Sequence, residues 1–433
     1  MNKQPQITVV DAIMGQGKTS WAIEMMNGKA FEYYFEDAPQ FLYITPFLEE
    51  AERIKEACTG LNFQLPAKLK GRKLSDLNAM LQNGDNVAST HALFRFLNQE
   101  SREALKEAET VLIIDEEVEF VLPFEDITPN SRRQLMHDQM ILVEEDGRVR
   151  WNYDQWPDYA DFGDRFSDIK RLADNGNLSL LDERFFIWEF PLDILALFDH
   201  VYVLTYLFEG SMLSTYLKAN GVQYQLATLS TDGRLVDFDN THERRELMRI
   251  RELVEVVDDK ELNAIGTPKN KREQPLSKRW MTRQKLANSA AFKKLKANLL
   301  TFFRHRASGG SKVAMWSTFS AVKTELKGNG YAGGFVAVNA KATNKHRHRR
   351  NLAYCANIFA HVGVQKYFHS KGQKVNEDLY AVSQLVQWIW RSRIRMTKSA
   401  DGQPLADSER TIKLYLPSER MRDLLAGWLD GRY

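Results

Sequence analysis

Short runs of apolar residues recur through the first half of the chain and alternate with helical patterns. The apolar runs lie at residues 7–12, 41–45, 86–90, 111–114 and 200–205, and helical patterns follow at 21–26 and 48–58. Continuously apolar strands separated by helices are typical of a parallel sheet that helices cover on both faces. The pattern therefore predicts an α/β domain in this half of the chain.

The second half repeats this theme. Strand-like runs lie at residues 313–316, 335–338, 352–359 and 411–416, and a helical pattern closes the chain at 421–429. Residues 231–290 are polar and charged, which indicates a connection between two domains or an elaborated linker. Since 433 residues suffice for two or three domains, at about 100–200 residues each, we place the domains at 1–230 and 231–433.

Residues 120–190 interrupt the α/β rhythm of the first domain. The stretch at 151–159 is aromatic and acidic. We expect a helical, aromatic insertion that packs on the domain. A surface on which nucleic-acid bases stack is the alternative, but the acidic neighbours of these rings argue against it.

Composition excludes several classes of protein. Hydrophobic residues make up 43% and charged residues 27%, which excludes a mostly disordered chain and a small disulfide scaffold. Lys and Arg number 59 against 57 Asp and Glu, so any basic surface must be local. Cys58 and Cys355 stand apart without ligand partners, and no apolar run is long enough for a membrane span. A cytoplasmic protein with reduced thiols is expected.

The strongest signal for chemistry is a glycine-rich loop between the first strand and the first helix. Residues 12–19 read Ala-Ile-Met-Gly-Gln-Gly-Lys-Thr, with Ala12 where the usual motif has its first glycine. Glycines let backbone N–H groups turn toward phosphates, and the following helix N-terminus favours the negative charge. The nucleotide-binding residues predicted here are Gly15, Gln16, Gly17, Lys18, Thr19 and Ser20. Lys18 would contact the β- and γ-phosphates of ATP, and Thr19 would bind Mg²⁺.

A pair of carboxylates follows the fourth apolar run. Asp115 and Glu116 come directly after residues 111–114, where a parallel sheet presents its ligand-binding edge. Asp115 is predicted to hold Mg²⁺, directly or through water. Glu116 is predicted to polarise the attacking water as a general base.

Three other strands end in residues that complete an ordered series. They are Thr45-Pro46, Thr90-His91 and Thr205. The series resembles superfamily 2 helicases of the DEAD/DEAH type, and the whole chain resembles helicase-like proteins that bacteriophages encode. This resemblance implies two tandem RecA-like domains with ATP in the cleft between them. It also implies that Thr45, Pro46, Thr90 and His91 contact nucleic acid and that Thr205 couples hydrolysis to movement.

The second half carries weaker counterparts of the later helicase motifs. Residues 316–319 resemble motif IV, 339–344 motif V and 387–395 motif VI. The resemblance implies that Thr318, Lys341, Thr343 and Asn344 contact nucleic acid and that Gln387, Arg391 and Arg395 act at the γ-phosphate. On one helix these last three residues would share a face, because they are four positions apart. Trp390 stands where the family has glycine, and the second arginine is Arg393 or Arg395.

Two basic clusters, at residues 269–285 and 341–350, are candidates for phosphate contacts. The sequence therefore predicts an ATP- and Mg²⁺-dependent helicase or translocase, with DNA preferred over RNA as its partner. The phage-like resemblance implies a role in DNA replication or recombination beside other proteins of those pathways, in the host cytoplasm. The alternatives are a nucleotide-gated nucleic-acid-binding protein and a DNA-packaging ATPase. A packaging enzyme with a nuclease would need clustered carboxylates, whereas Asp378, Asp401 and Asp407 are scattered.

Overall fold

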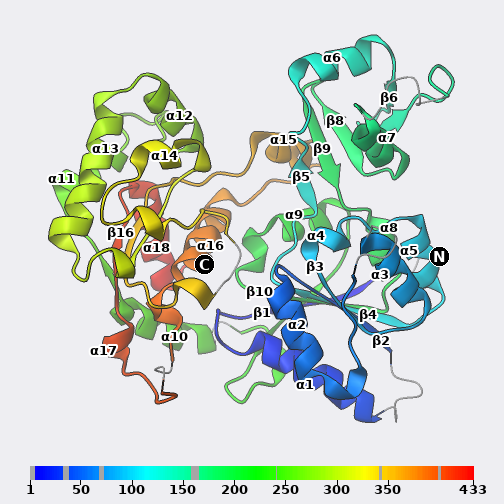
Figure 1. Cartoon of the computed structure of the whole chain (residues 1–433), viewed down its shortest axis with the longest axis horizontal. Helices are drawn as coiled ribbons and strands as arrows, with labels where there is room; N and C mark the ends of the chain where they lie inside the picture. The colour runs from blue at the N-terminus through cyan, green and yellow to red at the C-terminus, as the bar shows by residue number, and fades with distance from the viewer. Residues whose placement is uncertain are drawn as a thin grey trace. The chain divides into compact units, whose positions relative to one another are not determined.

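Two sheets organise the chain, one fully parallel and one parallel except for an edge strand, and each is flanked by helices (Figure 1). The computed structural model describes residues 5–32, 39–67, 73–157, 165–239, 241–340, 344–397 and 401–433. Unit 1 comprises residues 1–12, 16–238 and 360–375, and unit 2 comprises residues 13–15, 239–359 and 376–433. The α/β fold expected from the apolar runs is confirmed.

Seven strands form the central sheet of unit 1 in the order β12-β11-β1-β10-β4-β2-β3. Their bounds are β1 Gln6–Asp11, β2 Gln40–Thr45, β3 Val87–Thr90, β4 Thr110–Asp115, β10 His200–Thr205, β11 Gln225–Leu229 and β12 Leu235–Asp237. All neighbours run parallel except β12, which pairs antiparallel with β11 at one edge. The five predicted strands are present, and β11 and β12 are additions.

The helices of unit 1 lie between these strands in sequence. They are α1 Lys18–Glu32, α2 Leu48–Ala57, α3 Lys73–Gln82, α4 His91–Phe94, α5 Gln99–Lys106, α8 Leu192–Leu195 and α9 Met212–Ala219. Ala22 and Met26 of α1 and Ile54 of α2 join Phe41 and Ile113 of the strands in one buried cluster. Burial of these apolar side chains on the sheet is the main force that holds α1 and α2 in place.

The insertion at residues 120–190 contains the expected aromatic core and helices, together with short strands that were not predicted. Its elements are β5 Val121–Pro123, α6 Pro129–His137, β6 Ile141–Val143, β7 Val149–Trp151, α7 Ser167–Asp174, β8 Leu178–Leu181 and β9 Phe185–Glu189. β5, β9 and β8 form an antiparallel sheet, and β6 and β7 form a hairpin. Trp151 and Trp156 both donate their indole N–H to backbone carbonyls of the insertion, at 3.1 and 2.9 Å. These two rings therefore help to hold the insertion together, whereas Tyr153 is 49% exposed.

One helix from the second half of the sequence belongs to unit 1. α15, Val362–Ser370, packs against β5, β8 and β9 of the insertion and against α9 (Figure 1, orange). Tyr367 donates its hydroxyl to the Glu189 carboxylate, and Lys371 Nζ lies 3.3 Å from the same group. The Glu189 side chain is 12% exposed. This mostly buried carboxylate therefore joins the α15 segment to β9 of the insertion.

Unit 2 is built on a four-stranded parallel sheet with the order β13-β16-β15-β14. The strands are β13 Val254–Val256, β14 Ala314–Ser317, β15 Asn351–Tyr354 and β16 Ile412–Tyr415. The helices are α10 Thr241–Leu253, α11 Lys260–Asn263, α12 Lys278–Leu286, α13 Ala290–Thr301, α14 Lys323–Leu326, α16 Glu377–Ile389, α17 Asp407–Arg410 and α18 Glu419–Leu429. Side chains of α11, α12 and α13 pack on one face, with Trp316 and Tyr415. Trp388 of α16 packs against Tyr354 on the other face, where α16 contacts α18.

Three expectations for this unit are corrected. Residues 231–290 contain the passage between the units at 238–239 but form no extended linker, because α10 buries Leu247 and Ile250 and β13 is a strand of the sheet. Residues 335–338 form no strand: Phe335 makes one isolated bridge to Trp316, and the chain turns away at once. The strand predicted at 352–359 ends at Tyr354. In each case tertiary packing determines whether the segment forms a helix or a strand and where it ends, which a short apolar run alone does not indicate.

Cys58 and Cys355 are buried free thiols, and burial raises the pKa of Cys58 to about 11. A buried thiol of this kind stays protonated and is a poor nucleophile or metal ligand. Within the described ranges, no helix has the length and apolar character that crossing a bilayer requires.

The contact between α15 and the insertion yields a prediction. Tyr367→Phe removes a hydrogen bond to a mostly buried carboxylate, so we expect the free energy of opening of β8, β9 and α15 to fall by about 1.5–3 kcal/mol. Amide hydrogen exchange measures this. Lys366→Gln is the matched control, because its ion pair with Asp182 is exposed on both sides and such pairs contribute about 0–1 kcal/mol. Equal effects of the two substitutions would contradict the account.

Candidate nucleotide-binding site

The predicted phosphate loop joins β1 to α1 at the carboxyl edge of the unit 1 sheet. Gly15 and Gly17 have φ values of +90° and +88°, a region that only glycine adopts without strain. Trp21 N–H bonds to the Gly17 carbonyl at 2.8 Å, which sets the first turn of α1. Lys18 begins this helix, and its ammonium group contacts the Ala12 carbonyl. The loop therefore has the backbone that a phosphate cradle needs.

Thr19 and Asp115 meet at the same edge. Thr19 Oγ1 donates to Asp115 Oδ2 over 3.1 Å, although 96 positions separate the two residues. Asp115 is the last residue of β4, and only β10 separates β4 from β1 in the sheet. A hydroxyl and a carboxylate are hard oxygen ligands of the kind that Mg²⁺ prefers. The donor set thus fits the predicted metal.

A third side chain, Tyr43, shares this carboxylate and was not predicted. Its hydroxyl donates to Asp115 Oδ2 over 2.6 Å. Tyr43 lies fully buried on β2, which pairs directly with β4. Burial, reinforced by the neighbouring Asp115 charge, raises the pKa of Tyr43 well above its ordinary value. The tyrosine therefore remains a hydrogen-bond donor to the carboxylate.

The environment of Asp115 pulls its pKa in two directions. Burial raises the pKa of the carboxyl, whereas hydrogen bonds from Tyr43 and Thr19 and the charge of Lys18 lower it. Burial is the largest effect, and the pKa lies above its ordinary value. The two donors keep the ionised form accessible in a partly buried setting.

Glu116, the predicted base, has an unusual backbone. Its φ is +61°, in the left-handed region that non-glycine residues rarely adopt. Its N–H bonds to the Leu204 carbonyl of β10 at 3.0 Å, which holds the turn after β4. Such backbone strain costs on the order of 1–3 kcal/mol and clusters at functional sites. The catalytic role of Glu116 stays a prediction.

Asp11 is a second residue that the sequence reasoning missed. Its carboxylate, 6% exposed, accepts the backbone N–H groups of Leu207 and Phe208, each at 2.9 Å. Leu207 has a φ of +57°, so Asp11 stabilises a strained turn just beyond Thr205. Ala12 N–H also bonds to the Thr205 carbonyl at 3.1 Å. The start of the phosphate loop is thereby fixed to the segment that was predicted to couple hydrolysis to movement.

The residues predicted to contact nucleic acid in unit 1 take mixed positions. Thr45 and His91 are 1% and 5% exposed, and His91 Nε2 lies 2.9 Å from the Asp115 carbonyl oxygen. Thr90 is partly exposed and accepts the Leu93 N–H as the cap of α4. Pro46 is partly exposed. His91 is therefore placed to support the strand that carries Asp115, whereas Pro46 and Thr90 reach the surface.

The expectation that Gln387, Arg391 and Arg395 share one helix face is wrong. α16 ends at Ile389: the N–H groups of Arg391 and Ser392 bond three residues back, to the carbonyls of Trp388 and Ile389, and Ser392 is extended. Arg391 is 3% exposed, while Arg395 is exposed on the following short helix. Gln387 is partly exposed. Arg393, the other candidate, donates to the Glu409 carbonyl. Their action on a nucleotide stays a prediction.

The other contacts predicted for unit 2 are Thr318, Lys341, Thr343 and Asn344. Thr318 follows β14 and is fully buried. Lys341 and Thr343 lie outside the described residues. Asn344 begins a short 3-10 helix, Asn344–His346. In the second basic cluster, Arg349 donates to the Ala314 carbonyl, which gives this arginine a role within its own unit.

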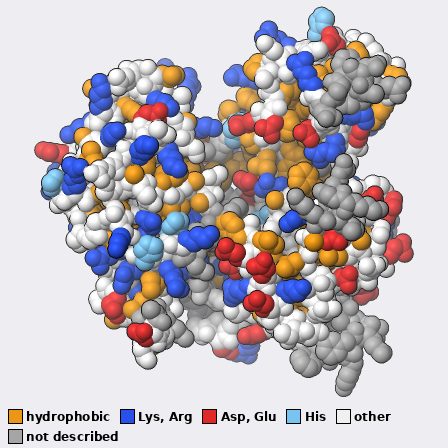
Figure 2. Space-filling model, viewed as in Figure 1, with side chains coloured by type: hydrophobic (Ala, Val, Ile, Leu, Met, Phe, Trp, Pro, Cys, Tyr) orange, Lys and Arg blue, Asp and Glu red, His pale blue; other side chains and the backbone are white. Residues whose placement is uncertain are grey.

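Charge divides sharply between the two units. Unit 2 carries 34 Lys and Arg against 18 Asp and Glu, a formal charge of +16, whereas unit 1 carries 25 against 39, or −14. Figure 2 shows Lys and Arg spread over the visible face of unit 2, at the left, and Asp and Glu gathered on unit 1. The net charge of the whole chain, +2, does not reveal this difference between the units. A strongly basic unit favours an anionic partner such as nucleic acid.

The fold is shared with a known structure. A solved structure of XPD in its apo form matches with a TM-score of 0.50 at 13% identity, over 97% of this chain and 95% of the other. This likeness concerns the fold alone, and the chain thus has a helicase-like α/β fold.

Sequence comparison identifies the family. Residues 248–429 match the description "YonV C-terminal Rossmann-like domain", and residues 124–188, within the insertion, match "YonV middle domain". The SPbeta prophage-derived protein YonV of Bacillus subtilis (strain 168) is 34% identical over 440 residues, which cover 99% of both chains. The chain described here therefore belongs to the YonV family.

Proposed function

We propose that this protein is an ATP-dependent motor of the superfamily 2 helicase type that moves along or unwinds DNA. The contact of Thr19 with Asp115 beside a phosphate-type loop carries this proposal. It unites a hydroxyl, a carboxylate and a lysine at one edge of a parallel sheet, the arrangement that triphosphate hydrolysis uses.

Each residue has a defined task in this proposal. Lys18 leaves the Ala12 carbonyl for the β- and γ-phosphates, while backbone N–H groups of residues 15–20 surround them. Thr19 and Asp115 hold Mg²⁺, which neutralises phosphate charge. Glu116 orients water and accepts its proton. An arginine of unit 2, with Arg391 the first choice over Arg395 and Gln387 beside them, stabilises charge on the γ-phosphate in the transition state.

The charge of unit 2 supports nucleic acid as the partner. Lys and Arg neutralise backbone phosphates irrespective of sequence, which is what a motor on nucleic acid requires. Pro46 and Thr90 of unit 1, and Lys341, Thr343 and Asn344 of unit 2, are the proposed additional contacts. Thr45, His91 and Thr318 would act from the interior by shaping these loops, and Thr205 would transmit the nucleotide state.

We propose DNA rather than RNA as the track, and a role in phage DNA replication or recombination in the cytoplasm of the bacterial host; the relative is a prophage-derived protein. No cluster of three metal-ligating side chains occurs among the described residues, so nothing there supports the nuclease of a packaging enzyme. The other alternative, a nucleotide-gated binding protein, would bind ATP without hydrolysing it, whereas a motor turns ATP over.

The direct test is ATP turnover by the full chain with and without single-stranded DNA. We expect turnover that rises several-fold when DNA is added, because a motor couples hydrolysis to its track. Lys18→Ala should reduce turnover by about 100-fold or more, since a phosphate-contacting cation is lost. Circular dichroism and the thermal midpoint should stay close to the parent, because Lys18 is partly exposed at a helix start.

Two outcomes would contradict the proposal in different ways. Parent-like hydrolysis by Lys18→Ala would refute the site. ATP binding without turnover, or turnover indifferent to DNA and RNA alike, would refute the motor and favour a nucleotide-gated binding protein.

Tyr43 allows a test of the geometry around Asp115. Asp115 must be ionised to hold Mg²⁺, so activity falls as pH drops through its pKa. Tyr43→Phe removes a hydrogen bond that lowers this pKa, and the acid limb of the pH–rate profile should move about one pH unit higher. Tyr202→Phe on β10, the other neighbour of β4, is the control. An unshifted acid limb in Tyr43→Phe would show that the hydroxyl does not tune Asp115.

A further inference from the structure

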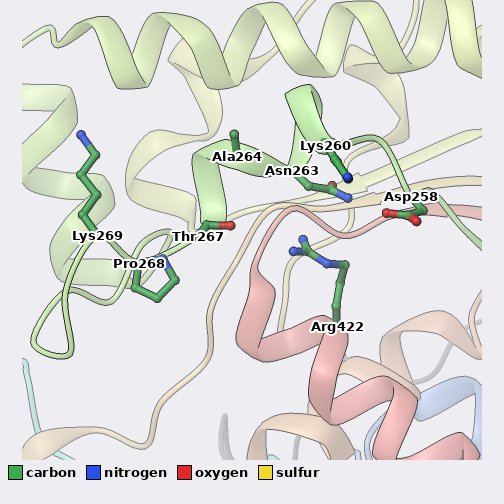
Figure 3. Close-up of a pocket in the computed structure, with 8 residues that line it drawn as sticks. All are labelled: Asp258, Lys260, Asn263, Ala264, Thr267, Pro268, Lys269 and Arg422. Carbon is green, nitrogen blue, oxygen red and sulfur yellow. The ribbon is translucent and has the colours of Figure 1, made fainter.

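Two features outside the phosphate loop combine polar side chains with a defined geometry. One is a groove of unit 2, which Figure 3 shows. Its arginine, Arg422, donates to the carbonyls of Leu416 and Pro417, at 2.8 and 2.7 Å, and its two lysines are exposed. Arg422 thus has a structural task, and exposed lysines select no particular anion. The other feature is the buried contact between His91 and the backbone of Asp115, which acts on the candidate site itself.

The peptide group that joins Asp115 to Glu116 is held at both of its polar atoms. Its carbonyl oxygen lies 2.9 Å from His91 Nε2, and its N–H donates to the Leu204 carbonyl over 3.0 Å. A carbonyl oxygen only accepts, so Nε2 of the imidazole carries the hydrogen. The two partners come from different sides of β4, because β10 is its neighbour on one side and β2 and then β3, which precedes His91, follow on the other.

The orientation of this peptide sets the backbone of Glu116, the proposed general base. Glu116 has a φ of +61°, and a residue other than glycine keeps such a value only where its surroundings hold it there. A rotation of the peptide would change this φ and redirect the Glu116 side chain. The Asp115 carboxylate is held separately, by Thr19 and Tyr43. The imidazole of His91 therefore acts on the base rather than on the proposed metal ligand.

His91 also follows directly on the proposed nucleic-acid contacts of unit 1. It is the first residue of α4, whose N-cap is Thr90. Thr90 is partly exposed and accepts the Leu93 N–H over 3.4 Å. In the sheet Thr90 is the partner of Thr45, the residue before Pro46. A strand of nucleic acid on Pro46 and Thr90 would thus rest on the turn from which the imidazole reaches the site.

Two further contacts join α4 to the segment after β4. Phe94, which is 1% exposed, stacks with Phe120 at a distance of 6.5 Å between ring centroids. Arg95, the residue after α4, forms an ion pair with Glu119 over 3.2 Å. With the imidazole, α4 is connected at three points to the segment that carries Glu116. Because tightly packed side chains transmit displacements, a movement of α4 changes the surroundings of the base.

We propose that His91 is a positioning residue that couples the binding of nucleic acid at Thr90 to the reaction at Glu116. Bound nucleic acid stabilises the α4 turn, so His91 keeps the peptide before Glu116 in place. Without nucleic acid the turn also populates arrangements in which Glu116 relaxes, and turnover falls. The inference rests on the proposed function, because it concerns the regulation of the same site.

Turnover of ATP by the full chain, with and without single-stranded DNA, tests the coupling. In His91→Asn the amide nitrogen falls short of the Nε2 position, whereas in His91→Gln the longer side chain reaches it. We expect His91→Asn to lose most of the several-fold stimulation by DNA through a lower kcat. KM for ATP should stay within about twofold of the parent, because Lys18, Thr19 and Asp115 still hold the nucleotide. His91→Gln should recover at least about half of the stimulation, because it restores the donor.

Amide hydrogen exchange of residues 112–119 gives a readout that does not depend on turnover. Exchange there should be about tenfold faster in His91→Asn, because a hydrogen bond that supports the turn is lost. Single-stranded DNA should slow this exchange in the parent but not in the variant. His200→Leu is the matched control: it removes the 2.9 Å contact of His200 Nε2 with Thr8 Oγ1, at the start of β10 and so at the opposite edge of the same sheet. This control should match the parent in both measurements.

The inference is overturned if a folded His91→Asn keeps the stimulation and the exchange of the parent. An equal loss in His91→Gln would show a purely structural role and would overturn it too. His91→Leu, which keeps much of the bulk of the ring without a donor, takes the place of His91→Asn if that variant does not fold. A parent whose turnover ignores DNA would refute the proposed function, whereas the exchange of residues 112–119 would still decide whether His91 holds the turn at Glu116.

Discussion

The candidate site depends on one carboxylate, Asp115, to which two side chains from other elements donate hydrogen bonds. Thr19 approaches it from the helix after β1, and Tyr43 approaches it from β2. The parallel register makes this possible, because every strand delivers its last residue to the same edge. Asp11 and Thr205 then fix the loops on either side. A shift of β4 by one residue would turn Asp115 to the opposite face and separate it from both donors.

The second constraint is the division of charge. A chain with a net charge of +2 folds into one unit of +16 and another of −14. Folding alone gives no reason for this separation, since each unit would be more stable with balanced charge. An anionic partner on unit 2 gives such a reason, and the proposed nucleic-acid track is such a partner.

The sequence predicted the parts of this protein whose signals are local. Apolar runs located the strands of unit 1, and the glycine spacing located the loop before Lys18. Contacts that depend on strand order, such as that of Tyr43 with Asp115, could not be predicted, because the same strands can be arranged in several orders in a parallel sheet. The shared helix face expected for Gln387, Arg391 and Arg395 was wrong for another reason: a spacing of four residues says nothing about where the helix ends, which is at Ile389.

The central claim is that Thr19 and Asp115 hold the metal of a bound nucleotide. The dependence of ATP affinity on Mg²⁺, measured by calorimetry in the parent and in Asp115→Asn, tests it most directly. The account predicts that Mg²⁺ tightens ATP binding about tenfold or more in the parent and has little effect in Asp115→Asn, which keeps the size of the side chain but loses its charge. An undiminished effect of Mg²⁺ in Asp115→Asn would contradict it.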